Sequence, residues 1–127
     1  MEKVFVTGVA RQLGHDLIIE LFRQGIISVG SDISPEYSGI NDHEAIQSMH
    51  YRSMDITDKT AVEKILFEEH PSVVIHCAAW TAVDLAEEPE YQEKVHKINA
   101  EGTKNIAEVC KKINCKMIYI STDYVFN

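Results

Sequence analysis

The sequence has no long apolar run. None of its stretches approaches the roughly 20 apolar residues that a membrane-spanning helix requires, and its start lacks the basic and apolar segments of a secretory signal peptide. Positive charge is also scarce, because 12 lysines and arginines stand against 20 aspartates and glutamates, a net charge of −8. This balance argues against non-specific binding to nucleic acid or anionic lipid. We expect neither a membrane nor a nucleic acid as partner.

Cysteine is sparse too. The three cysteines form no paired framework, which is typical of a reducing compartment rather than of secretion. No spacing of histidine and cysteine resembles a zinc site. We therefore predict a cytoplasmic protein without a metal centre.

The composition that remains is that of a globular domain. The 127 residues are 45% hydrophobic and 25% charged, enough chain for one packed core. Short apolar runs alternate with helical patterns, which predicts a doubly wound, Rossmann-like α/β fold with about five parallel strands. Strands are predicted at 4–6, 26–31, 49–54, 73–77 and 116–121, and helices from about 13 to Gly25, around 62–66 and from about Pro89 to 113, with a helical turn near 43–48.

The last predicted strand stands close to the end of the sequence. Only six residues follow Ser121, so this strand would form an uncovered edge of the sheet, a place where a second chain can pair. We expect either self-association through this edge or the N-terminal part of a longer protein, with residues 1–127 as a cofactor-binding unit.

A glycine loop follows the first strand. Gly8 and Gly14 flank the start of the first helix, an arrangement that directs backbone N–H groups and the helix dipole at a phosphate. The middle glycine of a G-x-x-G-x-x-G loop is replaced by Arg11. The loop predicts nucleotide binding, and Arg11 could either crowd the pyrophosphate or recruit a 2′-phosphate.

Two acids follow the next strands. Asp32 comes 18 residues after Gly14, close to the roughly 20 expected for a carboxylate that binds the ribose of a dinucleotide; its alternative role is to begin a turn. Asp32 favours NADH, whereas Arg11 could supply a cation for NADPH, so both cofactors stay open. Asp55 could contact the adenine amino group or cap the next helix, a role that Thr57 and Asp58 could fill equally well.

Small residues and hydroxyls follow the last two strands. Ala78 and Ala79 would let a ligand approach the backbone in the crevice of a doubly wound sheet. We expect Cys77 to be a buried, inert thiol and His76 to be a core or lining histidine. At the end of the fifth strand, Ser121 and Thr122 could hydrogen-bond a substrate carbonyl or simply form a turn.

With these motifs, the chain resembles the extended short-chain dehydrogenase/reductase superfamily, and within it the dTDP-4-dehydrorhamnose reductase branch. The resemblance extends over all 127 residues and is carried by Thr7-Gly8, Gln12-Leu13-Gly14, Asp55–Asp58, Ala78–Glu87, Asn99–Asn105 and Ser121–Phe126. Ala78–Glu87 and Ser121–Phe126 are specific to the reductase branch, whereas the glycine loop is shared by the superfamily.

The resemblance implies NADH- or NADPH-dependent reduction of the C4 ketone of a nucleotide-linked 6-deoxyhexose, as in dTDP-rhamnose biosynthesis. It implies cofactor contacts through Gly8, Arg11, Gln12, Leu13 and Gly14 at the pyrophosphate, Asp32 at the adenosine ribose, Asp55 and Ile56 at the adenine, and Ala78, Ala79 and Thr81 along the nicotinamide. It assigns Thr122, beside Ser121, to the catalytic hydroxyl and Asn99 to a structural asparagine behind the active site.

One family element is absent from the sequence. Each tyrosine that has a residue four positions later is followed there by something other than lysine, so the Tyr-x-x-x-Lys pair that donates the proton is missing. We therefore expect the 127 residues alone to be inactive. Two alternatives are a non-catalytic NAD(P)-binding module like the regulatory subunit of methionine adenosyltransferase, and an epimerase or dehydratase of the same superfamily, which Ala78–Glu87 matches less well.

Overall fold

A computed structural model describes residues 2–77 and 89–120 of the chain. Its sheet has five parallel strands in the order β3-β2-β1-β4-β5. The strands are β1 (Lys3–Thr7), β2 (Ile27–Asp32), β3 (His50–Ser53), β4 (Val73–His76) and β5 (Lys116–Tyr119). This is the order of a doubly wound sheet that begins at its centre and reverses direction after β3, so the predicted fold class is confirmed.

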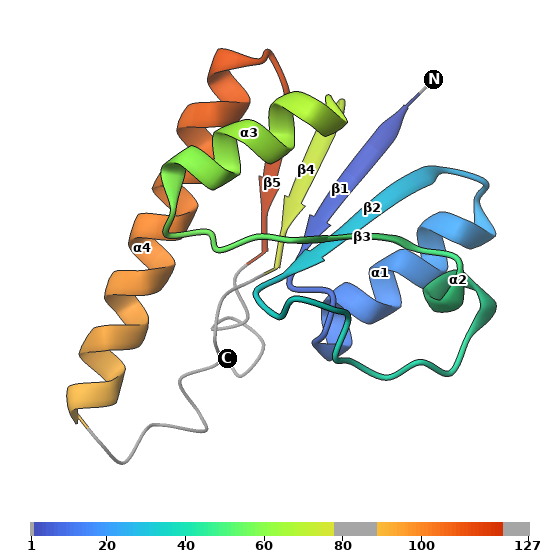
Figure 1. Cartoon of the computed structure of the whole chain (residues 1–127), viewed down its shortest axis with the longest axis horizontal. Coiled ribbons are helices and arrows are strands. Elements are labelled where there is room, and N and C mark those ends of the chain that lie inside the picture. Colours follow the sequence, from blue (N-terminus) through green and yellow to red (C-terminus); the bar gives the residue numbers. More distant parts are fainter. Residues whose placement is uncertain (1, 78–88, 121–127) are drawn as a thin grey trace.

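The helices cover the two faces of the sheet (Figure 1). In the described residues they are α1 (Gln12–Arg23), α2 (Glu44–Gln47), α3 (Lys59–Glu69) and α4 (Pro89–Lys112). α1 and α2 lie on one face, and α3 and α4 lie on the other. None of the helices in this part of the chain is long and apolar enough to cross a membrane.

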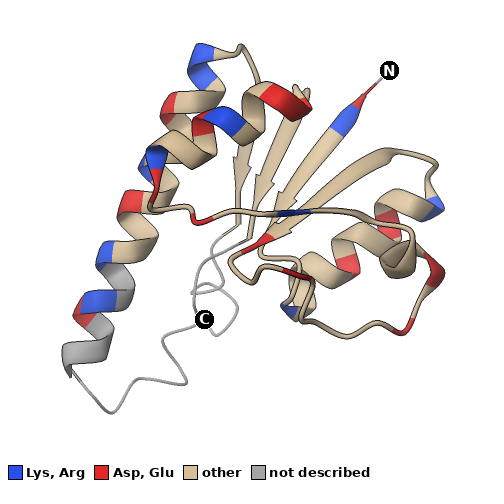
Figure 2. Cartoon of the chain, in the orientation of Figure 1, with Lys and Arg blue, Asp and Glu red and all other residues tan. Residues whose placement is uncertain are grey.

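The core follows from the alternation of side chains along each strand. Phe5 of β1 packs with the apolar faces of α3 and α4, whereas Val4 and Val6 point to the opposite face and pack with Ile18 of α1. Both faces of β1 are thus buried, as the continuous apolar run of this strand predicts for the centre of a parallel sheet. Figure 2 shows that the charged residues lie mainly on the helices and connections, and that the strands carry few.

The predicted elements are confirmed, with shifts of a few residues at their ends. Gly25 ends α1 with φ at 73°, a left-handed conformation that glycine adopts without steric cost. The helical turn expected near 43–48 is α2. The fifth strand was predicted to reach Ser121 but ends at Tyr119, and Ser121 itself lies outside the described residues. β5 does form an edge of the sheet.

Candidate nucleotide-binding site

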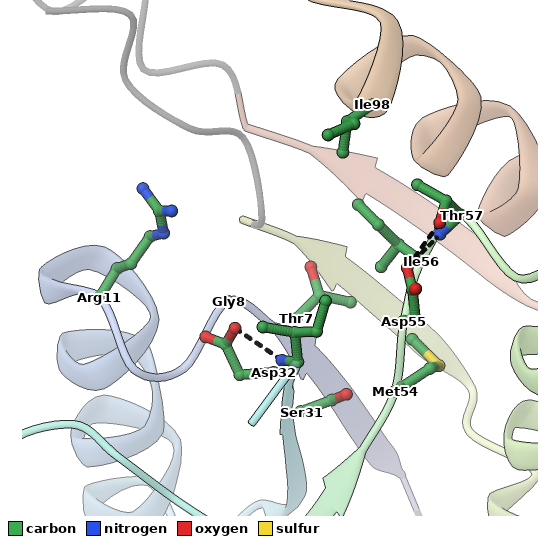
Figure 3. A pocket seen from close by; sticks show the side chains of 11 residues that line it. Thr7, Gly8, Arg11, Ser31, Asp32, Met54, Asp55, Ile56, Thr57 and Ile98 are labelled. Carbon is green, nitrogen blue, oxygen red and sulfur yellow. Dashed lines mark hydrogen bonds between the residues drawn. The ribbon is translucent and has the colours of Figure 1, made fainter. Parts of the chain in front are cut away.

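A pocket of about 180 Å³ lies over the carboxyl ends of β1, β2 and β3. Figure 3 shows that the end of β2 and the segment after β3 face each other across it, and that α4 approaches from above. Its lining residues are Thr7, Gly8, Arg11, Ser31, Asp32, Ile33, Met54, Asp55, Ile56, Thr57 and Ile98. In open α/β sheets this edge, near the reversal of strand order, is where ligands bind.

The glycine loop is folded tightly at the rim of the pocket. Gly8 has φ at 74°, and the N–H groups of Gly8 and Val9 donate to the Ser31 carbonyl at 2.8 and 3.2 Å. A Cβ on Gly14 would lie 2.3 Å from the Gly8 carbonyl oxygen, so a side chain at this position would separate α1 from the loop. The loop thereby keeps the first turn of α1 beside the pocket, and the N–H groups of a first turn have no partner within their own helix.

Asp32 links the second strand to the glycine loop. Its Oδ2 accepts from the Ala10 N–H at 3.0 Å, and its Oδ1 accepts from the Ile33 N–H at 2.8 Å. Two carboxylate oxygens offer about four acceptor positions, so these two bonds leave capacity for the hydroxyls of a ribose. The bond from the Ile33 N–H begins the loop that follows β2. Asp32 therefore begins a turn and also lines the pocket.

Asp55 is not the cap of α3. Its Oδ1 accepts from the backbone N–H of Thr57 at 2.9 Å and from the Thr57 hydroxyl at 2.7 Å, whereas the cap is Asp58, which accepts from the Ala61 N–H at 3.2 Å. Of the two roles left open for Asp55, helix capping is therefore wrong. Asp55 lies instead in the pocket wall, opposite Asp32 (Figure 3).

Two buried side-chain oxygens lack a hydrogen-bond partner, and one of them belongs to the pocket residue Ser31. They are Oγ of Ser31 and Oδ1 of Asn99, among the residues 2–77 and 89–120. Ser31 is only 1% exposed. Most buried polar atoms in proteins are hydrogen-bonded, and each exception calls for an explanation such as a functional role, strain or a bound water. The unpartnered hydroxyl of Ser31 suits a ligand that brings a polar group to the carboxyl ends of the strands. The close fit at Gly14 suits the same ligand, because it keeps the first turn of α1 beside the pocket.

A buried hydrogen-bond network joins the ends of β1 and β4. The Thr7 hydroxyl accepts from the Cys77 N–H at 2.9 Å and lies 2.7 Å from Nδ1 of His76. Nε2 of His76 lies 3.2 Å from the Thr103 hydroxyl. This arrangement is satisfied when Thr7 donates to Nδ1 and Nε2–H donates to Thr103. Burial lowers the pKa of His76 to about 4, so the ring stays neutral and serves as a core histidine, as predicted.

Cys77 is buried beside this network. Burial raises the pKa of its thiol to about 11, and the nucleophilic form is therefore negligible at neutral pH. The prediction of an inert thiol agrees with this environment. No group of three or more metal-ligating side chains occurs in the described part of the chain.

All of the predicted site residues except Asn99 divide into three groups. Those in the pocket lining are Gly8, Arg11, Asp32, Asp55 and Ile56. Those in the first turn of α1 are Gln12, Leu13 and Gly14, which do not line it: the Gln12 amide donates to Asp16 at 2.8 Å and Leu13 packs into the core. Those outside the described residues are Ala78, Ala79, Thr81, Ser121 and Thr122. Asn99 lies on α4, next to the pocket residue Ile98.

Sequence reasoning missed several lining residues. Thr7 and Ser31 stand at the ends of the first two strands, where alternation could have identified them as residues facing the crevice. Ile98 lies within the helix predicted from about Pro89 to 113, and its sequence neighbours do not mark it as a pocket residue. Met54 and Thr57 are adjacent to the residues predicted at the adenine, and their role follows from the path of the loop after β3.

The whole chain, residues 1–127, matches the family described as RmlD substrate binding domain. It is 36% identical over 122 residues to dTDP-4-dehydrorhamnose reductase of Streptomyces griseus, with 95% of this chain and 33% of the relative covered. It is 35% identical over 126 residues to dTDP-4-dehydrorhamnose reductase of Mycobacterium tuberculosis (strain ATCC 25618 / H37Rv), with 99% and 34% covered. The chain thus spans about a third of the length of these curated relatives.

Solved structures agree with the fold. UDP-glucose 4-epimerase from Bifidobacterium longum, in complex with NAD+ and UDP, matches with a TM-score of 0.82 at 25% identity, covering 98% of this chain and 38% of that one. The family match, the reductase relatives and the glycine loop at the edge of a 3-2-1-4-5 sheet confirm the resemblance that the motifs indicated. The chain belongs to the RmlD substrate binding domain family.

Proposed function

We propose that residues 1–127 form the dinucleotide-binding unit of an NADH- or NADPH-dependent reductase that acts on the C4 ketone of a nucleotide-linked 6-deoxyhexose. The observation that carries this proposal is the pocket over β1, β2 and β3, in which Asp32 is tied to the glycine loop. The relatives named dTDP-4-dehydrorhamnose reductase support the reaction. The epimerase in complex with NAD+ supports the class of cofactor.

The chain supplies contacts for each part of a dinucleotide. Asp32 accepts hydrogen bonds from the adenosine ribose, and Asp55 accepts from the adenine amino group. The first turn of α1 receives the pyrophosphate, because its N–H groups and dipole favour an anion. A nicotinamide cofactor, when bound, supplies the hydride that reduces a ketone. Ala78, Ala79 and Thr81 follow β4 and flank the nicotinamide half in this proposal.

The reacting carbonyl requires a hydrogen-bond donor and a proton. We assign the donor that orients the carbonyl to Thr122, with Ser121 beside it, and the supporting role behind the site to Asn99. The resemblance assigns the proton to a Tyr-x-x-x-Lys pair, which these 127 residues do not contain. The proton donor therefore comes from another segment, in the part of the relatives' length that this chain does not span.

Cofactor binding is the first test. The purified chain is titrated separately with NADH and NADPH, and binding is followed by nicotinamide fluorescence. We expect saturable binding, with NADH preferred, because the Asp32 carboxylate repels a 2′-phosphate. Binding of neither cofactor would overturn the proposal. A preference for NADPH would instead assign Arg11 to the 2′-phosphate.

Catalysis is tested with a dTDP-4-keto-6-deoxyhexose as substrate. We expect oxidation of NADH or NADPH by a protein of the relatives' full length that contains this chain, and none by the 127 residues alone. Turnover by the short chain would contradict the assignment of the proton donor to another segment.

The exposed edge of the sheet supports a proposal about assembly. β5 is an edge strand, and its residues Ile118 and Tyr119 are 41% and 45% exposed. We propose that the 127-residue chain self-associates by pairing at β5. Sedimentation that gives a single monomeric species at high concentration would contradict this.

A further inference from the structure

Helix α4 contacts the pocket wall over three successive turns. Ile98, Gly102 and Asn105 are spaced four and three residues apart, so they lie on one side of the helix. Ile98 lines the pocket, whereas Gly102 and Asn105 contact Ile56. The helix is therefore packed against the loop that follows β3 as well as against the sheet.

The contact at Gly102 leaves no room for a side chain. A Cβ at this position would lie 2.3 Å from Cδ1 and 2.5 Å from Cγ1 of Ile56. Real Cβ atoms do not approach other carbons so closely, and even alanine at 102 would force the Ile56 side chain to move. Because Ile56 also lines the pocket, such a move would change the shape of the wall.

The contact at Asn105 fixes the backbone of Ile56, the residue that also meets Gly102. Nδ2 of Asn105 donates to the Ile56 carbonyl at 2.9 Å, and Asn105 is 7% exposed. A shielded carbonyl that loses its donor costs more than a surface hydrogen bond, since water cannot readily replace the partner. By contrast, the ion pair between Lys59 of α3 and Glu108 of α4 is exposed and contributes little.

We propose that Asn105 is a positioning residue for the adenine end of the ligand and acts through Ile56. This proposal rests on the dinucleotide site proposed above. Thr57 holds Asp55 by two hydrogen bonds, so Asp55, Ile56 and Thr57 move as a unit when the Ile56 carbonyl shifts. The glycine loop is attached to β2 instead. Asn105 therefore controls the adenine end and leaves the pyrophosphate end unaffected.

The test compares two small probes, AMP and inorganic pyrophosphate, on the same 127-residue chain. Asn105→Leu keeps the branch at Cγ but removes the donor. In titrations followed by NMR, we expect the affinity for AMP to fall about tenfold, the effect of losing one hydrogen bond to a shielded carbonyl. The affinity for pyrophosphate should stay within about twofold, which is a negligible free-energy change.

Two further variants complete the design. Gly102→Ala disturbs Ile56 through the other contact and should reproduce the selective loss of AMP binding. Lys104→Leu places the same side chain as the first variant on the exposed side of α4, and it should change neither affinity. The thermal unfolding of each variant shows whether it is folded.

Three outcomes would overturn the proposal, and they are distinguishable. Unchanged AMP binding by folded Asn105→Leu and Gly102→Ala would exclude the positioning role but would leave the proposed dinucleotide site in place. Equal losses of AMP and pyrophosphate binding would mean a general structural defect rather than positioning. Failure of the unaltered chain to bind AMP would overturn the dinucleotide site itself.

Discussion

The amino ends and the carboxyl ends of the parallel strands form two sides of the sheet, the amino edge and the carboxyl edge. Polar side chains at these two edges differ in whether their hydrogen-bonding capacity is used. At the amino edge, the 8%-exposed carboxylate of Glu69 accepts from Lys3 at 3.2 Å, from His50 at 2.9 Å and from Arg52. At the carboxyl edge, the buried hydroxyl of Ser31 has no partner among the described residues. The same sheet thus has one edge with saturated polar groups and one with spare hydrogen-bonding capacity.

This difference separates stability from binding. A saturated group can only lose interactions, so its substitution lowers the free energy of unfolding. An unsaturated group weakens the fold, and it contributes favourably only when a ligand arrives. We therefore expect substitutions at the amino edge to lower the free energy of unfolding and to leave binding intact. Substitutions at the carboxyl edge should weaken binding without lowering the free energy of unfolding.

The largest effect is expected from Glu69→Gln. The amide removes the negative charge that accepts hydrogen bonds from Lys3, His50 and Arg52, and we expect the free energy of unfolding to fall by about 2 kcal/mol, the range for hydrogen bonds to charged groups. Urea denaturation measures this loss of the free energy of unfolding. Glu68→Gln is the matched control, since Glu68 pairs only with Arg52 in the described chain and is 48% exposed, and it should change stability by less than about 0.5 kcal/mol. An equal loss in both variants would contradict the comparison.

The pH dependence of stability tests the same edge. Burial alone would raise the pKa of Glu69, but hydrogen bonds from Arg52, His50 and Lys3 outweigh it and lower the pKa from 4.5 to about 2. A carboxyl whose pKa is lower in the folded state stabilises the fold fully above its unfolded pKa, and this contribution is lost as the pH falls. We expect the stability difference between the unaltered chain and Glu69→Gln to shrink from pH 5 towards pH 2. A difference that is constant over this range would show that the charge of Glu69 is unimportant.

Much of this architecture was predictable from the sequence, because it depends on periodicity. The continuous apolar run of β1 and the 3.6-residue spacing of apolar residues along α4 each depend on local residues and on burial. The order of elements then fixes a parallel doubly wound sheet. Gly8, Asp32 and Asp55 were located by their positions just after strands, and the structure brings them to one pocket.

The missed features depend on contacts between distant segments. The bond from Asn105 to Ile56 joins residues 49 positions apart, and no local pattern marks either partner. Asp55 and Asp58 are equally good caps by residue type, and only the path of the chain into α3 selects Asp58. The orphaned hydroxyl of Ser31 is likewise invisible in the sequence, since serine normally finds a partner.

A smaller effect, on binding, is expected from Asp32→Asn at the carboxyl edge. The amide keeps one oxygen that can accept from Ala10 or Ile33, so the fold should lose little stability. Without the charge, hydrogen bonds to ribose hydroxyls weaken, and NADH affinity should fall about tenfold. Glu36→Gln, an exposed site in the following connection, controls for the change in net charge. A loss of stability without a loss of NADH affinity would show that the carboxylate only braces the glycine loop.

The smallest effect is expected from Ser31→Ala at the carboxyl edge. Removing a buried hydroxyl that has no partner removes its desolvation cost, so the free energy of unfolding should rise by about 1 kcal/mol. The same substitution should weaken AMP binding about threefold, because the ligand loses a group that it would satisfy. Opposite signs in the two measurements are the signature of a residue kept for binding, whereas Glu69→Gln should lower stability and leave AMP affinity unchanged. If Ser31→Ala lowers stability, the hydroxyl already has a partner such as a buried water, and the carboxyl edge is then as saturated as the amino edge.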